Sequence, residues 1–313
     1  MCTAVSYTAG RHYFGRNLDL DHNYGEQVTV AARHFPVAGM EKHSGIIGMA
    51  AVIDGYPLFF EGTNEDGLSV AALNFPGNAV YHKAAEGKEN IPSYDFISYL
   101  LTRCKTCREA KALLKNAVIC DCQFGEKTPT TPLHWLVADR EMAFAAESTA
   151  EGLQLYDDPI GVLTNNPPFP YHRDNLCRYM ALHSGKAENR LAPSLDLKPF
   201  SFGMGAVGLP GDFSSPSRFV RAAFVLHNSP KNEDRAVSQF FRILDAAAVP
   251  DGCVKTDSGF QKTLYSCCCD TDRGIYYYTT AHNRQITAVD MHKTDLESNH
   301  ITQFPLIETE QIH

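Results

Sequence analysis

Residues 1–20 read MCTAVSYTAGRHYFGRNLDL, and this stretch decides the fold. Two strand-like runs, residues 2–8 and residues 11–20, flank the dipeptide Ala9-Gly10. A short loop containing glycine between two such runs is typical of a β-hairpin. We therefore expect the chain to begin with a hairpin whose second strand returns towards Cys2.

Further strand-like runs follow the hairpin, and Gly, Pro, Asn or Asp residues separate them. They are QVTVAA, IIGMAAVI, YPLFFEG and LSVAALNF in the first third, TPLHWLVAD, MAFAAES and GLQLYD in the middle, and KTLYSCCC, GIYYYTTA and QITAVDM near the end. Because neighbouring runs are joined by short turns, we expect antiparallel sheets.

Helical segments lie between these groups of strands. Apolar spacing predicts one helix over about residues 94–116, a helical segment after Tyr171 through DNLCRYMALH, and helices over residues 217–227 and 233–248. Residues from about 184 to 201 are polar and contain two prolines, which predicts an extended excursion. The order of strands and helices predicts a single α+β domain that spans the whole chain, residues 1–313.

Composition and charge restrict the class of function. The chain has 313 residues, of which 44% are hydrophobic and 20% charged, as in ordinary globular proteins. Its net charge is −8 and its basic residues are scattered, so we expect no nucleic-acid partner. No run approaches the roughly 18 apolar residues of a membrane-spanning helix, and the start does not resemble a signal peptide. We therefore expect no membrane association and a cytoplasmic location.

Cys2 directly follows the initiator methionine. Aminopeptidases remove Met1 when the second residue is small, and the mature chain would then begin with a cysteine that has a free amine. Such an amine has a pKa of about 7.7–8.0, so it is partly neutral near pH 7 and is suited to take the thiol proton. The hairpin brings Arg16 and Asp19 near Cys2, where Arg16 is suited to stabilise a thiolate. Spacing alone leaves open an ordinary surface pair of Arg16 and Asp19.

Several segments carry a resemblance to a known family. They are MCTA, FGRNLD, NEDGLSVAALNFPG, LHWLVAD, GVLTNNPPF, GLPGDFSSPSRFVRAAF and KTLYS followed by a Tyr-rich strand. In this order, from residue 2 to about residue 280, they resemble the choloylglycine hydrolase family, which contains bile salt hydrolases and penicillin V acylases. The resemblance implies an N-terminal nucleophile hydrolase with an αββα sandwich of two antiparallel sheets. It also implies a homotetramer, in which residues 184–201 reach a neighbouring subunit, and an enzyme with no metal or cofactor.

The same resemblance implies six site residues, which are Cys2, Arg16, Asp19, Asn74, Asn165 and Arg218. The cysteine is the nucleophile, the Arg and Asp of GRNLD support it, the two asparagines lie beside the oxyanion, and the arginine of SPSRF completes the site. Neutral amide donors suit an oxyanion that forms only in the transition state. From the residues alone, Asn74 and Asn165 also fit turns, Asn166 rivals Asn165, and Arg218 fits the start of a helix.

Two other patterns allow different chemistry. His134 in LHWLVAD is of the type that activates a catalytic cysteine, but it lies in an alternating strand beside the chain's sole tryptophan. We interpret His134 as structural, because the terminal amine already supplies a base. Four cysteines, which are Cys104, Cys107, Cys120 and Cys122, allow a zinc site. Their C-x-C spacing and an apolar helical stripe favour buried thiols instead.

The substrate is expected to be a conjugated bile salt. Bile salt hydrolases split the amide between a steroid acid and glycine or taurine, whereas penicillin V acylases split a phenoxyacetyl amide. Asn74 is similar to the residue that bile salt hydrolases carry at this position, where the acylases commonly carry tyrosine. Penicillin V acylase activity is the first alternative. A non-catalytic binding protein for amphipathic anions is an alternative from another class.

Overall fold

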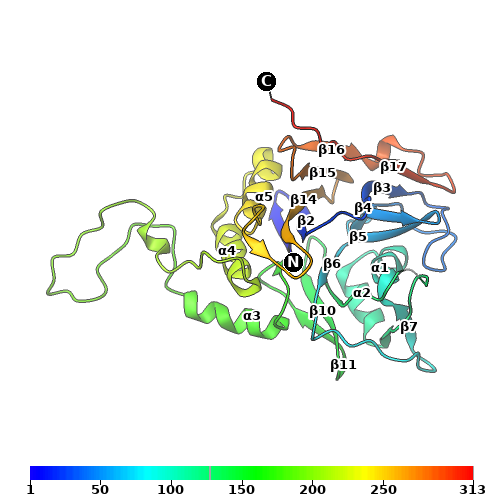
Figure 1. The fold of residues 1–313 in the computed structure, drawn as a ribbon, viewed down its shortest axis with the longest axis horizontal. Helices are drawn as coiled ribbons and strands as arrows, with labels where there is room; N and C mark the ends of the chain where they lie inside the picture. Colours follow the sequence, from blue (N-terminus) through cyan, green and yellow to red (C-terminus); the bar gives the residue numbers. More distant parts are fainter. Residues whose placement is uncertain (127, 313) are drawn as a thin grey trace.

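The architecture is a four-layer sandwich, seen in a computed structural model that describes residues 1–126 and 128–312. Two antiparallel sheets form the middle layers, and helices cover both outer faces (Figure 1). The covering helices are α4 (Ser215–Asn228) and α5 (Ala236–Asp245) on the first sheet, and α1 (Phe96–Arg103) and α2 (Cys107–Leu114) on the second. This is the predicted α+β arrangement.

The first sheet carries the N-terminal hairpin at its centre. Within the described residues its strands, in spatial order, are β12 (Val162–Leu163), β1 (Cys2–Ala9), β2 (Arg11–Leu20), β14 (Phe260–Asp270), β15 (Ile275–Thr280) and β16 (Thr287–Asp290), with β13 (Val254–Lys255) paired to β14. Gly10 has φ +73°, a left-handed conformation that glycine adopts without strain, and it closes the predicted hairpin. Strand β2 therefore lies between the N-terminal strand β1 and β14, a strand from the last fifth of the chain.

The second sheet supplies Asn74 and the loops around it. Its described strands, in spatial order, are β11 (Gly152–Asp157), β10 (Ala143–Thr149), β9 (Leu133–Ala138), β6 (Ser69–Asn74), β5 (Tyr56–Asn64), β4 (Ile46–Ile53), β3 (Gln27–Ala31) and β17 (Ile301–Phe304). A separate parallel pair is formed by β7 (Glu89–Pro92) and β8 (Ala117–Cys120). Strands β7, β8, β12, β13 and β17 are too short or too polar for periodicity to predict them.

Two hydrophobic clusters hold the layers together. One lies between the two sheets and extends under α4 and α5, with side chains such as Phe14, Leu136 and Phe240. The other lies between the second sheet and α1 and α2, with Phe96 stacked on Trp135 at a ring-centroid distance of 4.0 Å. Each strand of the two sheets except β13 therefore has at least one face in a core, which explains the high hydrophobic content of the strand-like runs.

The predicted helix over residues 94–116 is wrong as a single helix. A 3-10 turn at Ser93–Asp95 leads into α1, and the chain is then extended at Cys104 before α2 begins. Thr106 caps α2 by accepting a hydrogen bond from the Glu109 N–H at 3.2 Å. This Thr-x-x-Glu spacing is a helix-start signal, but the apolar stripe continues across it and hides the break.

The other helix predictions hold with shifted ends. The segment predicted after Tyr171 through residue 183 begins earlier, as α3 (Phe169–Asn175), and ends earlier, in a 3-10 turn over Leu176–Tyr179. Residues 180–183 are not helical. Pro170 lies in the first turn of α3, a position that proline favours. The prediction over residues 233–248 corresponds to a 3-10 turn followed by α5.

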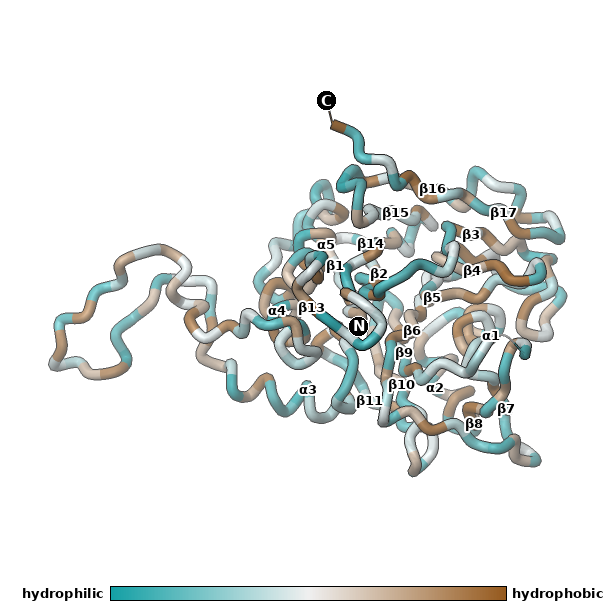
Figure 2. Tube along the Cα trace, in the orientation of Figure 1, coloured by the Kyte–Doolittle hydropathy of each residue, from teal (hydrophilic) through white to brown (hydrophobic). Residues whose placement is uncertain are grey.

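A long arm, residues 180–207, projects from the sandwich between α3 and α4 (Figure 1, at the left). Its described residues 184–201 contain neither helix nor strand, so the predicted extended excursion is confirmed. Apolar segments interrupt the polar ones along the arm (Figure 2). Its exposed large apolar side chains are Met180, Leu191, Leu195, Leu197, Phe200, Phe202 and Val207. Within the described part of the chain, no helix has the length and apolar character needed to cross a membrane.

Candidate active site

Cys2 begins strand β1, and its thiol faces the guanidinium of Arg16. Cys2 pairs with Leu18 across the hairpin and Ala4 pairs with Arg16, so the Cys2 and Arg16 side chains lie on the same face. An Nη of Arg16 lies 2.5 Å from Cys2 Sγ. The other Nη donates to the carbonyl oxygens of Ala72, at 2.5 Å, and Phe60, at 3.2 Å. The second sheet therefore fixes the arginine that contacts the thiol.

Glycine at position 15 lets strand β14 approach Arg16 closely. A Cβ at Gly15 would lie 2.0 Å from the carbonyl oxygen of Cys267, so any other residue would push β2 and β14 apart. With glycine, the Arg16 N–H reaches Cys267 Sγ at 3.3 Å. The glycine of FGRNLD thus has a steric role beside the site.

A buried carboxylate, Glu61, lies behind Arg16. Its Oε2 is 3.8 Å from Arg16 Nε, and its two oxygens accept hydrogen bonds from the hydroxyls of Tyr265, at 2.8 Å, and Tyr276, at 2.5 Å. Burial raises the pKa of Glu61, and Arg16 opposes this rise. Burial alone would lower the pKa of Arg16. The nearby Cys2, Tyr265 and Glu61 raise it by more than burial lowers it, so the net shift is upward. Arg16 therefore carries a permanent positive charge beside the thiol.

Asp19 is buried and has one oxygen without a partner. Its Oδ1 accepts a hydrogen bond from Thr263 Oγ1 at 2.6 Å, while Oδ2 has no hydrogen-bond partner among the described residues. Burial raises the pKa of Asp19, and Arg218, whose Nη lies 3.8 Å from Oδ2, lowers it. The main chain of Asp19 pairs with Met1, since the Met1 amine donates to the Asp19 carbonyl at 2.6 Å. The carboxylate therefore lies close to the N-terminus of the chain.

Asn165 and Arg218 hold the main chain of Cys2. The Cys2 N–H donates to Asn165 Oδ1 at 2.9 Å, and the Cys2 carbonyl accepts from Arg218 at 2.5 Å. A second Nη of Arg218 donates to the same Asn165 oxygen at 2.6 Å. Burial lowers the pKa of Arg218, and Asp19 and Cys2 oppose this effect. These bonds fix the first residue of β1 from two directions.

Asn74 and Asn165 lie next to each other at the edge of the site. Asn165 Nδ2 donates to the Asn74 carbonyl at 2.7 Å. The side chain of Asn74 is half-buried and makes no hydrogen bond to the described residues, so its amide donor is available. Asn166 instead donates to the carbonyl of Pro76 and does not contact Cys2. Of the two neighbouring asparagines, Asn165 is the one that contacts Cys2.

The structure thus gathers all six predicted residues in one place. Cys2, Arg16, Asp19 and Arg218 are buried, and Asn165 is nearly so. The thiol faces a guanidinium, the Cys2 nitrogen contacts an amide oxygen, and the Asp19 Oδ2 nearby accepts no hydrogen bond from the described residues. Such a cluster can stabilise a thiolate and can orient an amine at the Cys2 nitrogen.

Comparison with known proteins identifies the family of this chain. The linear amide C-N hydrolases of the choloylglycine hydrolase family match residues 2–304. The chain belongs to this family. It is 43% identical to the bile salt hydrolase/transferase of Lactiplantibacillus plantarum, over 98% of this chain and 97% of that protein. It is 36% identical to the bile salt hydrolase/transferase of Clostridium perfringens, over 100% of this chain and 99% of that protein.

Solved structures agree with this membership. The fold is similar to the crystal structure of a conjugated bile acid hydrolase from Clostridium perfringens, with a TM-score of 0.93 and 36% identity over 100% of this chain and 99% of that one. A penicillin V acylase from Agrobacterium tumefaciens shares the fold at a TM-score of 0.74 and 20% identity, over 97% and 91% of the two chains. The predicted family and the predicted N-terminal nucleophile hydrolase fold are confirmed.

The four cysteines considered as zinc ligands lie away from Cys2. Cys104 ends α1, Cys107 begins α2, and Cys120 ends β8, while Cys122 is exposed. Burial raises the pKa of Cys104 to about 11 and also raises that of Cys107. Across residues 1–126 and 128–312, no three His, Cys, Asp or Glu side chains are grouped as a metal site requires.

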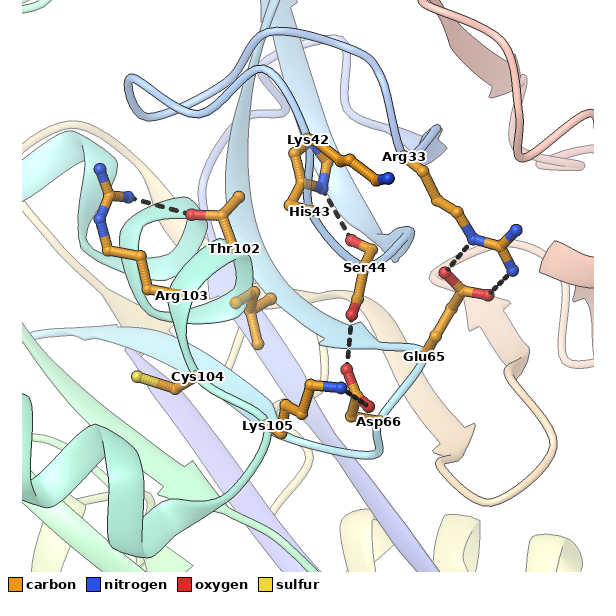
Figure 3. A pocket seen from close by; sticks show the side chains of 11 residues that line it. Arg33, Lys42, His43, Ser44, Glu65, Asp66, Thr102, Arg103, Cys104 and Lys105 are labelled. Atoms are coloured by element: carbon orange, nitrogen blue, oxygen red, sulfur yellow. Dashed lines mark hydrogen bonds and ion pairs between the residues drawn. The ribbon is translucent and has the colours of Figure 1, made fainter.

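A cavity of about 480 Å³ also lies apart from the six residues (Figure 3). Four of its charged side chains form two ion pairs, Arg33 with Glu65 at 2.7 Å and Lys105 with Asp66 at 3.3 Å. Its one thiol is Cys104, whose raised pKa keeps it protonated and unreactive near neutral pH. The cavity therefore offers no reactive thiol.

Sequence reasoning did not predict the residues that contact Arg16 and Asp19 from behind the site. Glu61, Tyr265 and Tyr276 behind Arg16, and Thr263 on Asp19, were not predicted as site residues. Glu61 did leave a signal, because it is a lone carboxylate inside the apolar run YPLFFEG. A charge at a core position of a strand is rarely tolerated unless it is paired.

Proposed function

We propose that the chain hydrolyses the amide bond of glycine- or taurine-conjugated bile salts, with Cys2 as the nucleophile after removal of Met1. One observation carries the assignment of the nucleophile. Cys2 Sγ lies against the Arg16 guanidinium, while the Cys2 nitrogen lies on Asn165 Oδ1. The substrate class rests on full-length relatives that are 36% and 43% identical and are named for bile salt hydrolysis.

In the first step the Cys2 amine takes the thiol proton, directly or through a water, and the thiolate attacks the substrate carbonyl carbon. Removal of Met1 turns the Cys2 nitrogen into an amine with additional hydrogens. Asn165 Oδ1 already accepts from this nitrogen, and Asp19 Oδ2, which has no hydrogen-bond partner among the described residues, is suited to accept another hydrogen. These two oxygens direct the amine so that its lone pair is available to the thiol.

In the second step the tetrahedral intermediate collapses and the amide bond breaks. The Cys2 ammonium returns its proton to the leaving nitrogen of glycine or taurine, and the acyl group remains as a thioester on Sγ. The amide of Asn74 and the second hydrogen of Asn165 Nδ2, whose first hydrogen goes to the Asn74 carbonyl, are suited to the oxyanion. One such donor contributes a factor of about 10²–10³ in rate. A water molecule, deprotonated by the amine, then hydrolyses the thioester.

Penicillin V acylase activity is the alternative within the family. The solved acylase shares only 20% identity with this chain, so it supports the fold alone. Asn74 is smaller than the tyrosine that we expect in acylases, and it leaves more room beside the nucleophile for a bulky steroid. A pocket contact of this kind discriminates between substrates by about 1–3 kcal/mol.

The experiment that tests this function is amino-acid release from glycocholate, taurocholate and penicillin V under reducing conditions. We expect release of glycine or taurine by the wild type and none by Cys2→Ala. A variant with a bulky residue inserted between Met1 and Cys2, which prevents removal of Met1, should be inactive as well. Full activity of either variant contradicts the mechanism, whereas turnover of penicillin V alone contradicts the substrate assignment.

We further propose that the protein is a cytoplasmic homotetramer in which the arm contacts a neighbouring subunit. Phe200 and Phe202 on the arm are 88% and 89% exposed, and neighbouring exposed aromatic residues are common at interaction sites. All ten cysteines are unpaired, which is usual in a reducing compartment. Light scattering of the purified protein tests the assembly, and a monomer at micromolar concentration contradicts it.

A further inference from the structure

Two buried histidines bind consecutive carbonyl groups beside the Cys2 cluster. His134 Nε2 lies 3.0 Å from the Thr164 carbonyl oxygen, and His172 Nε2 lies 2.8 Å from the Asn165 carbonyl oxygen. Both imidazole rings are fully buried. A carbonyl oxygen only accepts hydrogen bonds, so each of these Nε2 atoms must carry a proton. The segment that presents the Asn165 side chain is therefore held by two directed donors.

His134 receives its orientation from Glu147. His134 Nδ1 lies 3.0 Å from Glu147 Oε1, and neither residue is exposed. Since Nε2 already donates to Thr164, a proton must also lie between Nδ1 and Oε1; otherwise two lone pairs would face each other. Whether this proton belongs to the ring or to the carboxyl group, the pair is neutral as a whole, as burial requires. In both cases Nε2 keeps its proton.

Glu147 also controls the second histidine through helix α3. The same Oε1 accepts a hydrogen bond from the N–H of Phe169, the first residue of α3, at 3.0 Å. Helix α3 carries His172, whose ring stacks on Phe219 at a centroid distance of 4.9 Å. Burial lowers the pKa of His172 to about 4, so the ring is neutral near pH 7. Its Nδ1 has no partner in the described structure, as expected for a neutral ring whose proton is on Nε2.

His134 contacts the loop of the other asparagine too. Its ring lies parallel to Phe75, with centroids 4.2 Å apart and an angle of 5° between the planes. Phe75 directly follows Asn74, and Asn165 Nδ2 donates to the Asn74 carbonyl at 2.7 Å. His134 thus contacts both loops that carry the asparagines proposed to bind the oxyanion: it stacks on Phe75, next to Asn74, and donates to Thr164, next to Asn165.

We propose that Glu147 is a positioning residue that acts through His134, and through α3 and His172, to hold Asn165 against Cys2. Both carbonyl contacts of the Thr164–Asn165 segment lead back to this one carboxylate. The inference rests on the proposed amide hydrolysis, in which Asn165 lies beside the oxyanion. It assigns to His134 the role of a fixed donor to the main chain, distinct from that of a base for the thiol.

The variant Glu147→Gln tests this role with little change in shape. The Phe169 N–H requires an acceptor at Oε1, so the glutamine oxygen must remain there and His134 Nδ1 must donate to it. The neutral ring then has no proton on Nε2, and its lone pair faces the Thr164 carbonyl. A comparable wrong-tautomer substitution in a serine protease lowers kcat by about 10⁴. Here the histidine acts one step further from the reacting atoms, so we expect a smaller loss.

We expect kcat for glycocholate to fall by roughly 10- to 100-fold in Glu147→Gln, with KM changed by less than about threefold, as for other outer partners of reacting groups. Glu151→Gln is the matched control, because Glu151 follows β10 on the surface and its side chain pairs, among the described residues, with Thr149 alone, at 2.8 Å. It should keep wild-type kinetics. Wild-type kcat in Glu147→Gln overturns the inference while leaving the proposed function intact.

A second pair of variants tests the α3 branch and does not touch the buried carboxylate. His172→Phe keeps a ring that stacks on Phe219 but removes the donor to Asn165. His172→Gln keeps an N–H donor of similar reach. We expect Phe to lower kcat about tenfold and Gln to recover most of that loss, with KM unchanged in both. Equal activity of the two variants contradicts the role of the donor.

Neutron diffraction from deuterium-exchanged crystals provides a readout that does not depend on turnover. In the wild type we expect deuterium on His134 Nε2 and between Nδ1 and Glu147 Oε1; in Glu147→Gln, Nε2 should carry none and Thr164 should be displaced. A wild-type His134 without deuterium on Nε2 overturns the inference even if the wild type releases no amino acid from bile salts. If the wild type is inactive but the deuterium pattern is as expected, only the proposed function fails.

Discussion

The Cys2 cluster and the arm depart from the usual distribution of side chains in opposite directions. In the cluster, the charged residues Arg16, Asp19 and Arg218 are at most 1% exposed. On the arm, the apolar residues Phe200 and Phe202 are 88% and 89% exposed. Soluble proteins normally place charges outside and aromatic rings inside. Each departure therefore needs a compensating interaction, and the two regions differ in where that interaction comes from.

Compensation in the cluster comes from the chain itself. Each arginine contacts a carboxylate and several carbonyl oxygens, so few of its donors are unsatisfied. Such pairing offsets the desolvation of a buried charge only when the set is complete. The rings of the arm have no such set among the described residues, and the proposed tetramer would supply their compensation from another subunit. We therefore predict that the buried charges of the cluster serve catalysis and that the exposed rings of the arm serve assembly.

The largest effect should come from breaking a pair inside the cluster. Arg16→Met leaves Glu61 buried without its cation, and removal of one partner of a buried pair costs about 3–5 kcal/mol in the free energy of unfolding. It also removes the charge beside the Cys2 thiol. Chemical denaturation measures the first effect, and the rate of thiol alkylation at pH 7 measures the second. The double variant Arg16→Met/Glu61→Gln should recover part of the stability but none of the alkylation rate.

A loss of similar size is expected for the rate when Asn165 is truncated. Asn165→Ala removes the oxygen that accepts from the Cys2 nitrogen and from Arg218, together with an amide donor beside the oxyanion. We expect kcat to fall by about 10²–10³. Asn166→Ala is the control, because Asn166 contacts Pro76 rather than Cys2. Equal losses of kcat in Asn165→Ala and Asn166→Ala contradict the assignment of Asn165, and not Asn166, to the site.

Acid should weaken the buried interior and leave the arm unaffected. Burial lowers the pKa of His12 from 6.5 to about 4, so between these values the unfolded chain binds a proton that the folded chain does not. Stability is therefore complete above pH 6.5 and is lost as the pH falls towards 4. The loss for this histidine is about 3 kcal/mol, at about 1.4 kcal/mol for each pH unit. Unfolding midpoints measured across this range should fall less steeply in His12→Asn.

The smallest effect on the protomer should come from the arm. Because Phe200 and Phe202 make little contact within the chain, Phe200→Ser/Phe202→Ser should change the free energy of unfolding of the protomer by less than about 0.5 kcal/mol. The same double variant should shift the assembly to smaller species in light scattering. An unchanged assembly contradicts the role of the arm. A large loss of protomer stability contradicts the claim that Phe200 and Phe202 make little contact within the protomer.

The sequence by itself determined the hairpin and the contact between Cys2 and Arg16. The turn at Gly10 and the alternation of β1 and β2 set the register, and the register puts both side chains on one face. It also determined the arm, because a polar, proline-containing segment cannot form a core. The positions of Asn74, Asn165 and Arg218 followed from the resemblance to the family, since nothing local joins them to Cys2.

Tertiary structure alone decided which distant groups complete the site. Asp19 meets Thr263 across 244 positions of the chain, and Arg16 depends on Glu61 and on tyrosines of β14 and β15. The convergence of His134 and α3 on Glu147 arises in the same way. Strand pairing between the two ends of the chain, and the stacking of one sheet on the other, create these contacts. Periodicity reports only which face of a strand is buried, and it does not identify the residues that meet that face.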